Sequence, residues 1–323
     1  MILAGDVGGT KVVLALFQDT ETRKKIKEQK FASKDYSNFE DIVKAFVSED
    51  TPIRCASFGI AGPIVNNKCY ATNLPWIIDG NELKNVLKTP SVFLINDLEA
   101  NAWGTFSLQK DEFYVLNEGI EKKGNCALIS AGTGLGEAGF YFDGKNLFPF
   151  ASEGGHVGFS PENEEDIELW RYFKTKFQHV SFERLLCGHG IANIYDFFVK
   201  IKKEPEIEEV KVAMQKMDPA QVISEYGMQK KCPTCMKTLE KFSSIYGGEA
   251  GNLALKFLAF GGVFIGGGIA PKLLEVLKKG AFMNSFINKG RFKQLLSEIK
   301  VQVILNQETA LLGAAKYAEM KIS

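Results

Sequence analysis

Three glycine-rich segments of this chain each follow a β-rich run. Glycine has no Cβ atom, so such a turn lets backbone N–H groups approach an anion and form a concave nest around it. The candidate phosphate-binding residues are Gly5, Asp6, Val7, Gly8, Gly9, Thr10 and Lys11 in the first segment, Gly132, Thr133 and Gly134 in the second, and Gly266, Gly267 and Gly268 in the third. Three such turns in one chain favour a nucleoside triphosphate site, although a tight turn without a ligand would explain each one alone.

The first two segments differ from the best-known nucleotide motifs. In the first segment a threonine, and not a glycine, directly precedes the lysine, so the segment is not a Walker A loop. Its Thr10 hydroxyl can donate a hydrogen bond, and Asp6 can hold a hydrated Mg²⁺ ion beside phosphates. The second lacks the G-x-G-x-x-G spacing of the dinucleotide fingerprint, because position 137 is a glutamate. The third precedes an expected helix that begins at Pro271 and points its N-terminus at a nucleotide.

Asn96 and Asp97 end a buried strand expected over residues 91–97. The carboxyl ends of strands in α/β proteins are where ligands bind. Asp97 could accept the proton of a hydroxyl group, as a general base does in phosphoryl transfer. Asn and Asp also favour helix N-caps, and a cap is the better explanation of Asp97 when it is taken alone.

Glu153 and His156 flank two glycines, and a further carboxylate, Glu183, stands near the start of a helix expected over residues 182–199. Carboxylates and imidazoles accept hydrogen bonds, which suits the vicinal hydroxyl groups of a sugar. A structural histidine, and a glutamate placed at a helix N-terminus, are the alternatives. Cys232 and Cys235 form a single C-x-x-C pair, to which we assign no metal, because structural zinc usually takes four protein ligands.

Composition excludes several classes of protein. The 323 residues are 45% apolar and 24% charged, which rules out a disordered chain. The 39 basic and 39 acidic residues cancel, so no positive field exists for nucleic acid or an anionic membrane. Six cysteines in a chain of this length are not a disulfide scaffold. With no signal peptide or membrane span in the sequence, we expect a cytoplasmic protein.

The elements that must position these residues alternate between strands and helices, which indicates an α/β architecture. A strand, a glycine turn and a second strand occur over residues 2–17 and again over 126–142, so the pattern predicts two copies of one α/β unit. Residues 55–63 are expected to form a strand that runs into a turn, residues 263–271 a strand, a glycine turn and a helix start, and residues 299–305 a further strand. Helices are expected at 39–47, 82–87, 163–177, 239–260 and 309–320.

Taken together, the ordered segments resemble the bacterial glucokinase family, ATP-dependent sugar kinases of the hexokinase, actin and Hsp70 superfamily. The resemblance runs in order across nearly the whole chain. The segments that carry it are residues 5–10 (GDVGGT), 59–63 (GIAGP), 72–76 (TNLPW), 95–97 (IND), 131–136 (AGTGLG), 153–157 (EGGHV), 181–184 (SFER) and 260–269 (FGGVFIGGGI).

The resemblance implies two RNase H-like (actin-like ATPase) domains with a central cleft: a small α/β domain over 1–107, completed by a C-terminal helix over 306–323, and a large one over 108–305. It implies ATP with Mg²⁺ at the glycine turns, and glucose held by Asn96, Asp97, Glu153, His156 and Glu183. Asp97 matches the family's catalytic base. The reaction implied is phosphorylation of glucose at the 6-hydroxyl to give glucose 6-phosphate and ADP, at the entry to glycolysis. We further expect a homodimer that binds no nucleic acid and no membrane.

Other functions fit parts of the pattern. A kinase for fructose, mannose or an amino sugar, of the related ROK type, is the main alternative, but the cysteine-rich zinc motif usual in that family is missing after His156. A sugar-responsive repressor would need a helix-turn-helix segment before the first strand, which begins at Ile2. An actin-like filament protein would not need the glutamate–histidine pair.

Overall fold

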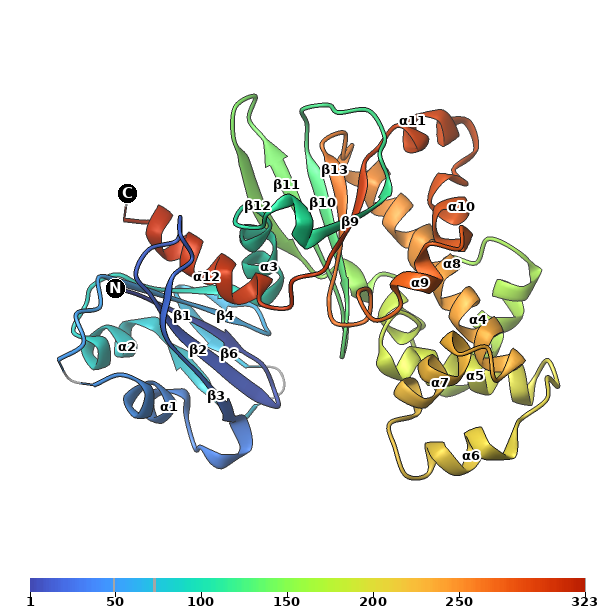
Figure 1. Ribbon diagram of the computed structural model, residues 1–323, viewed down its shortest axis with the longest axis horizontal. Helices are drawn as coiled ribbons and strands as arrows, with labels where there is room; N and C mark the ends of the chain where they lie inside the picture. The colour runs from blue at the N-terminus through green and yellow to red at the C-terminus, as the bar shows by residue number, and fades with distance from the viewer. Residues whose placement is uncertain (49, 72–73, 323) are drawn as a thin grey trace. The chain divides into compact units, whose positions relative to one another are not determined.

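The computed structural model describes residues 1–48, 50–71 and 74–322. Residues 72 and 73 of the 72–76 segment, and residue 323 at the end of the expected C-terminal helix region, lie outside this range. The chain divides into two compact units of mixed α/β structure (Figure 1). Unit 1 comprises Met1–Glu112, Pro149–Ala151 and Asn306–Ser323, and unit 2 comprises Phe113–Phe148 and Ser152–Leu305.

Unit 1 contains a five-stranded sheet of order β3-β2-β1-β4-β8. Its strands are β1 (Ile2–Val7), β2 (Lys11–Phe17), β3 (Lys25–Ala32), β4 (Cys55–Ile60) and β8 (Val92–Asn96). β1, β2 and β3 pair antiparallel, whereas β4 runs parallel to both β1 and β8. The carboxyl ends of β1, β4 and β8 therefore meet at one edge of this sheet.

Helices cover the sheet of unit 1 on both faces. They are α1 (Phe39–Phe46), α2 (Gly80–Leu87), α3 (Asp97–Thr105) and α12 (Thr309–Met320). Successive side chains of a strand point to opposite faces. In β1, Leu3 therefore joins the apolar cluster that contains Phe39 of α1, whereas Ile2 and Ala4 join the cluster that contains Leu311 of α12.

Unit 1 also contains several smaller elements. A three-stranded sheet is made of β5 (Ile64–Val65), β6 (Lys68–Tyr70) and β7 (Ile77–Asp79). Two short 3-10 helices are η1 (Ser33–Asp35) and η2 (Lys110–Glu112).

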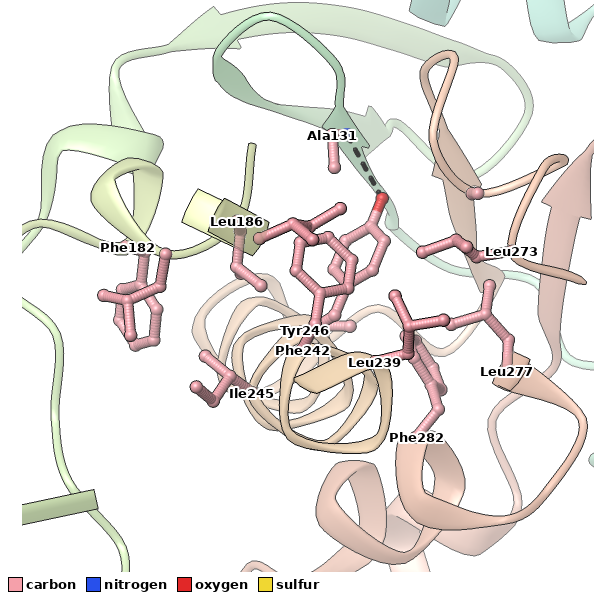
Figure 2. Packing of buried hydrophobic residues seen from close by; sticks show 14 of the residues in the cluster. Ala131, Phe182, Leu186, Leu239, Phe242, Ile245, Tyr246, Leu273, Leu277 and Phe282 are labelled. Atoms are coloured by element: carbon pink, nitrogen blue, oxygen red, sulfur yellow. Dashed lines mark hydrogen bonds between the residues drawn. The ribbon is translucent and has the colours of Figure 1, made fainter. Parts of the chain in front are cut away.

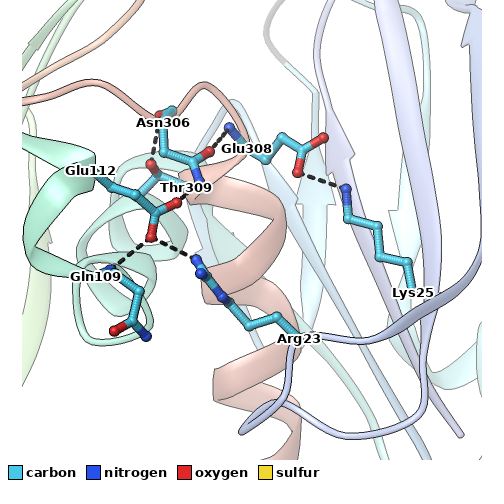
Figure 3. Close-up of polar contacts among 7 residues, drawn as sticks. All are labelled: Arg23, Lys25, Gln109, Glu112, Asn306, Glu308 and Thr309. Carbon is cyan, nitrogen blue, oxygen red and sulfur yellow. Dashed lines mark hydrogen bonds and ion pairs between the residues drawn. The ribbon is translucent and has the colours of Figure 1, made fainter.

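Polar contacts connect the C-terminal segment to the N-terminal part of unit 1 (Figure 3). Glu112 is the centre of this network, because its carboxylate accepts hydrogen bonds from Arg23 Nη1 at 2.7 Å and from the Asn306 side-chain amide. Lys25 Nζ lies 2.6 Å from Glu308 Oε2. These contacts place the start of α12 beside the β2–β3 hairpin, although the residues are nearly 300 positions apart in the sequence.

The second sheet has six strands in the order β12-β11-β10-β13-β14-β9, and all of its residues except 149–151 of β12 belong to unit 2. Its strands are β9 (Phe113–Asn117), β10 (Cys126–Ala131), β11 (Leu135–Phe142), β12 (Leu147–Ser152), β13 (Gly262–Gly266) and β14 (Val301–Ile304). β10 pairs antiparallel with β11 and parallel with β13, which pairs parallel with β14. This is the arrangement of β1, β2, β4 and β8 in unit 1, as the repeated hairpin pattern predicts.

The helices of unit 2 are α4 (Glu164–Lys176), α5 (Gly188–Lys200), α6 (Glu208–Met214), α7 (Pro219–Met228), α8 (Pro233–Phe257), α9 (Leu274–Leu277), α10 (Ala281–Ile287) and α11 (Lys293–Ser297), with 3-10 helices η3 (Gly154–His156), η4 (Phe182–Arg184) and η5 (Gly290–Phe292). In the part of the chain that the structure covers, no helix combines the length and apolar character needed to cross a membrane.

Three expected helices in unit 2 have other bounds in the structure. The helix predicted over 239–260 is α8, which begins at Pro233 and ends at Phe257, because Pro233 at its first position and the Cys232 cap start it earlier. The predicted helix over 182–199 is broken into η4 and α5, because the Cys187 side chain caps α5 by accepting a hydrogen bond from Gly190 N. Glu183 therefore lies in η4 and not at the start of the long helix. The helix after the third glycine turn begins at Leu274, so Pro271 precedes it and is not in its first turn.

The long helix α8 forms the centre of the apolar core of unit 2 (Figure 2). Tyr246 of α8 is fully buried and packs edge-on against the rings of Phe242 and Phe282. Its hydroxyl oxygen accepts a hydrogen bond from Ala131 N at 3.2 Å and lies 3.3 Å from the carbonyl oxygens of Ile129 and Gly266, to either of which it can donate. This residue therefore fixes the carboxyl ends of β10 and β13, where the second and third glycine turns begin.

Candidate active site

Asn96 and Asp97 lie where β8 ends and α3 begins in unit 1. Asn96 is the N-cap of α3: its Oδ1 accepts a hydrogen bond from Leu98 N at 2.9 Å, and its Nδ2 donates to Gly62 O at 3.2 Å. Asp97 is the first residue of the helix, and its Oδ1 also accepts from Leu98 N at 2.9 Å. The alternative in which Asp97 is the cap is therefore wrong. The cap holds Asp97 at the edge where β1, β4 and β8 end.

The first glycine turn connects β1 to β2 at the same edge of unit 1. Gly5 and Val7 are buried within β1, whereas Thr10 and Lys11 are exposed. Gly8 N donates to Lys11 O at 3.0 Å and closes the turn. The part of the segment that a ligand can reach is therefore the turn over residues 8–11.

Asp6 lies at the end of β1 and is partly buried. Burial raises the pKa of its carboxyl group, and the positive charge of Lys11 opposes that shift. A carboxylate that has lost part of its hydration is stabilised by a nearby cation. The position and chemistry of Asp6 therefore fit the expected contact with a hydrated Mg²⁺ ion.

The second and third glycine turns lie side by side in unit 2. Ser130 pairs with Gly266 at the ends of β10 and β13, and Ile269 N donates to Ala131 O at 3.2 Å. Gly188 N, at the start of α5, donates to Gly132 O at 3.0 Å. The structure thus brings both turns and a helix N-terminus to one edge of the sheet.

Within these turns the residues differ in how far a ligand can approach. Thr133 and Gly268 are exposed, and Gly132 and Gly134 are partly so. Gly266 is buried at the end of β13. Gly267 has a φ angle of +83°, which favours glycine, and its missing side chain leaves room for Ala131 O. The exposed surface of the two turns is therefore formed by 132–134 and Gly268.

Glu153, His156 and Glu183 come together in unit 2. His156 Nε2 lies 3.8 Å from Glu153 Oε2, and His156 Nδ1 lies 3.8 Å from Glu183 Oε1. The side chains of Glu153 and His156 are 71% and 59% exposed, and that of Glu183 is 27% exposed. Two carboxylates on either side of an accessible imidazole can accept hydrogen bonds from several hydroxyl groups of one polyol.

Glu183 also contacts the second glycine turn. Its Oε2 accepts a hydrogen bond from Leu135 N at 3.2 Å, and a Cβ atom added to Gly134 would lie 2.6 Å from the same oxygen. A Cβ atom added to Gly132 would meet nothing within 4 Å. The glycine at 134 therefore makes room for Glu183, whereas the one at 132 leaves the surface of the turn open.

Glu137 and Tyr246 belong to none of the motifs that point to the site. Glu137 of β11 is 1% exposed, and burial, together with the negative charge of Glu249, raises the pKa of its carboxyl group to about 7. Its signal in the sequence is a carboxylate inside a strand of otherwise apolar and small residues. Tyr246 has no comparable signal, because a tyrosine in an apolar helix is usual.

Cys232 and Cys235 lie at the start of α8 and are fully buried. Cys232 caps the helix, since its Sγ accepts a hydrogen bond from Cys235 N at 3.2 Å. Burial raises the pKa of the Cys235 thiol, which lowers the reactive thiolate fraction. The pair therefore has a structural role at the helix start.

The repeated sheet pattern, with glycine turns at the carboxyl ends of its parallel strands, defines an α/β protein of the actin-like ATPase fold. The glucokinase family model matches residues 3–321. A glucokinase of Nostoc punctiforme is 38% identical over 333 residues, which cover 98% of each chain. The chain therefore belongs to the glucokinase family.

Solved structures share this fold. The crystal structure of a glucokinase from an Antarctic psychrotroph has a TM-score of 0.84 and is 28% identical, with 99% of this chain and 98% of that chain covered. A ROK family glucokinase from Streptomyces griseus, solved in complex with glucose and AMPPNP, shares the fold at a TM-score of 0.68 and 20% identity, with 99% of each chain covered.

Proposed function

We propose that this chain transfers the γ-phosphoryl group of ATP to the 6-hydroxyl of glucose, and so produces glucose 6-phosphate and ADP. The observation that carries the proposal is the group formed by Glu153, His156 and Glu183 beside the second glycine turn. It supplies hydrogen-bond acceptors for a sugar directly beside backbone suited to phosphate. Membership of the glucokinase family supports the same reaction.

Hydrogen-bonding side chains would hold the sugar. We propose that Glu153, His156 and Glu183 bind its hydroxyl groups through their exposed oxygen and nitrogen atoms. Asn96 would add a donor, because its Nδ2 has a second N–H besides the one donated to Gly62 O. Fixing several hydroxyl groups orients the sugar, and orientation supplies much of the rate enhancement in a reaction between two bound substrates.

Asp97 would act as the general base. Its position at the first turn of α3 is fixed by the Asn96 cap, so the carboxylate is held by the helix and not by a mobile loop. It would take the proton of the 6-hydroxyl as the oxygen attacks the γ-phosphorus. Asp97 would thus both bind the sugar and accept its proton.

The glycine turns would bind the nucleotide. The exposed residues of the turns at 8–11 and 132–134 would contact the phosphates, and Gly268 would approach the adenosine. Asp6 would hold the Mg²⁺ ion through water, in keeping with its partly buried carboxylate. A bound Mg²⁺ ion would neutralise phosphate charge during transfer.

Two further expectations complete the proposal. All six cysteines are free thiols, which supports function in a reducing compartment such as the cytoplasm. A homodimer is the assembly that we expect, and light scattering coupled to gel filtration would measure it directly.

A coupled assay of ADP production tests the reaction. The purified chain should consume ATP with glucose in preference to fructose, mannose and glucosamine, and Asp97→Asn should serve as the inactive control. Faster turnover of another hexose would assign the ROK-type alternative. Absence of turnover with every hexose would contradict the proposal as a whole.

A further inference from the structure

Glu137 forms the support on which the turn between Glu153 and His156 rests. A Cβ atom added to Gly154 would lie 1.9 Å from Glu137 Oε2 and 2.8 Å from its Cδ, so the carboxyl group fills the space of a side chain at position 154. Ser152 Oγ donates to Glu137 O at 3.0 Å and accepts from Gly154 N at 3.2 Å. The turn is thus packed on the side chain of Glu137 and hydrogen-bonded to its backbone.

The surroundings of this carboxyl group favour its neutral form. Glu137 Oε1 is buried and has no hydrogen-bond partner among the described residues. Glu249 of α8 is fully buried and acts on Glu137 as a negative charge, although Asn252 and Lys256 bind its carboxylate at 2.8 and 3.0 Å. Burial of Glu137 and this negative charge raise its pKa, whereas the positive charge of Lys256 lowers it. The net result is a pKa of about 7.

Titratable groups lie on the elements packed against Glu137. Those on α8 that interact with it are Glu249, Lys256 and Tyr246. The Glu153–His156 turn and η4 carry Glu153, His156 and Glu183. Lys256, the one cation among those on α8, is paired with Glu249. An ionised Glu137 would therefore meet more negative than positive charge.

We propose that Glu137 is a positioning residue: its neutral carboxyl group supports the Glu153–His156 turn in the arrangement that binds sugar, and its ionisation displaces the turn and weakens sugar binding as the pH rises. An ionised carboxylate needs hydrogen-bond donors that Oε1 lacks here. The Glu153–His156 turn consists of two glycines between the exposed residues Glu153 and His156, so its displacement would let water reach the carboxyl group. This inference rests on the proposed sugar site.

Calorimetric titration with glucose from about pH 6 to about pH 9 tests the inference. In the wild type the dissociation constant for glucose should rise about threefold or more above pH 7, with ATP affinity unchanged. Glu137→Gln keeps the shape and neutrality of the carboxyl group, so its glucose affinity should lose this dependence. Glu209→Gln, which changes an exposed glutamate of α6, is the matched control and should behave as the wild type.

Each outcome decides the question. His156 is present in all three proteins, so only the difference between Glu137→Gln and the wild type reports on Glu137. A wild-type profile retained in Glu137→Gln, or a wild type without alkaline weakening, would overturn the inference. If Glu137→Gln does not fold, infrared spectroscopy of the wild type decides, because a protonated carboxyl group has its own carbonyl band. A band that vanishes across neutral pH as glucose affinity falls would support the inference. Any other result would overturn it. Failure of the proposed function would give a different result, because none of the three proteins would then bind glucose at any pH.

Discussion

The Glu183 carboxylate joins the second glycine turn to the histidine of the candidate sugar site. Its Oε2 lies 3.2 Å from Leu135 N, which directly follows the turn, and its Oε1 lies 3.8 Å from His156 Nδ1. One side chain therefore contacts both the backbone expected at the phosphates and the imidazole expected at the sugar. A change in the turn should reach the sugar site through Glu183.

The two glycines of this turn give a matched pair of variants. Gly134→Ala should displace Glu183 Oε2, because the new Cβ atom would lie 2.6 Å from it. We expect the dissociation constant for glucose to rise about tenfold, since a hydrogen bond to a charged group contributes roughly 1.5–3 kcal/mol. Gly132→Ala, whose Cβ atom would meet nothing within 4 Å, should leave glucose affinity unchanged. Equal glucose affinity of the two variants in calorimetry would contradict the role of Glu183.

Asp97→Asn should nearly abolish turnover and leave weakened sugar binding. The amide keeps the shape of the side chain but cannot take the proton of the 6-hydroxyl, and loss of a general base lowers kcat by about 10²-fold or more. Steady-state kinetics measures kcat, and calorimetry measures glucose binding by the same variant. A kcat near that of the wild type would rule out Asp97 as the base.

Glu153→Gln should weaken glucose binding by about 1.5–3 kcal/mol, because one hydroxyl group loses a charged acceptor. ATP affinity should remain close to that of the wild type. Separate titrations with glucose and ATP measure the two effects. If the variant binds glucose as tightly as the wild type, Glu153 is a structural carboxylate and not a sugar ligand.

Tyr246→Phe should lower the free energy of unfolding by about 1–3 kcal/mol, because it leaves the buried N–H of Ala131 without its acceptor. The control is Tyr195→Phe: the Tyr195 hydroxyl is also buried but has no hydrogen-bond partner among the described residues, so its removal should be neutral or stabilising. Urea unfolding of both variants measures the difference. Equal destabilisation by the two changes would show that the Tyr246 hydroxyl does not stabilise the strand ends.

Glu137→Gln should stabilise the protein against unfolding as the pH rises. The pKa of Glu137 is about 7 in the folded chain and 4.5 for an ordinary glutamate, so between these pH values the unfolded chain releases a proton that the folded chain retains. Wild-type stability therefore falls across this window, by up to roughly 3 kcal/mol, and is level above it. A glutamine at position 137 does not titrate. The free energy of unfolding of the variant minus that of the wild type should therefore grow from about pH 4.5 to about pH 7. Urea midpoints that stay parallel would contradict this linkage.

Much of the fold could be predicted because local patterns express it directly. The predicted boundaries of the last helix, Thr309–Met320, agree with α12, since its apolar and small residues follow a helical period. The hairpins over 2–17 and 126–142 were equally clear, because β-rich runs flank glycine turns. The edge strand β3 gave no such signal, since five of its eight residues are exposed and most are polar.

The sequence by itself determined the fold class, the family, and which residue types could bind phosphate and sugar, because glycine spacing and carboxylate–histidine motifs are local properties of the chain. Only the tertiary structure decided that Asn96 and not Asp97 caps α3, that Glu183 contacts Leu135, and that Glu137 lies beneath Gly154. These relationships join residues on different elements or depend on one hydrogen-bond choice between neighbours. Burial of Glu137 next to Glu249 likewise exists only after β11 packs near α8, because a pKa depends on the charges and the solvent that the folded chain places around the group.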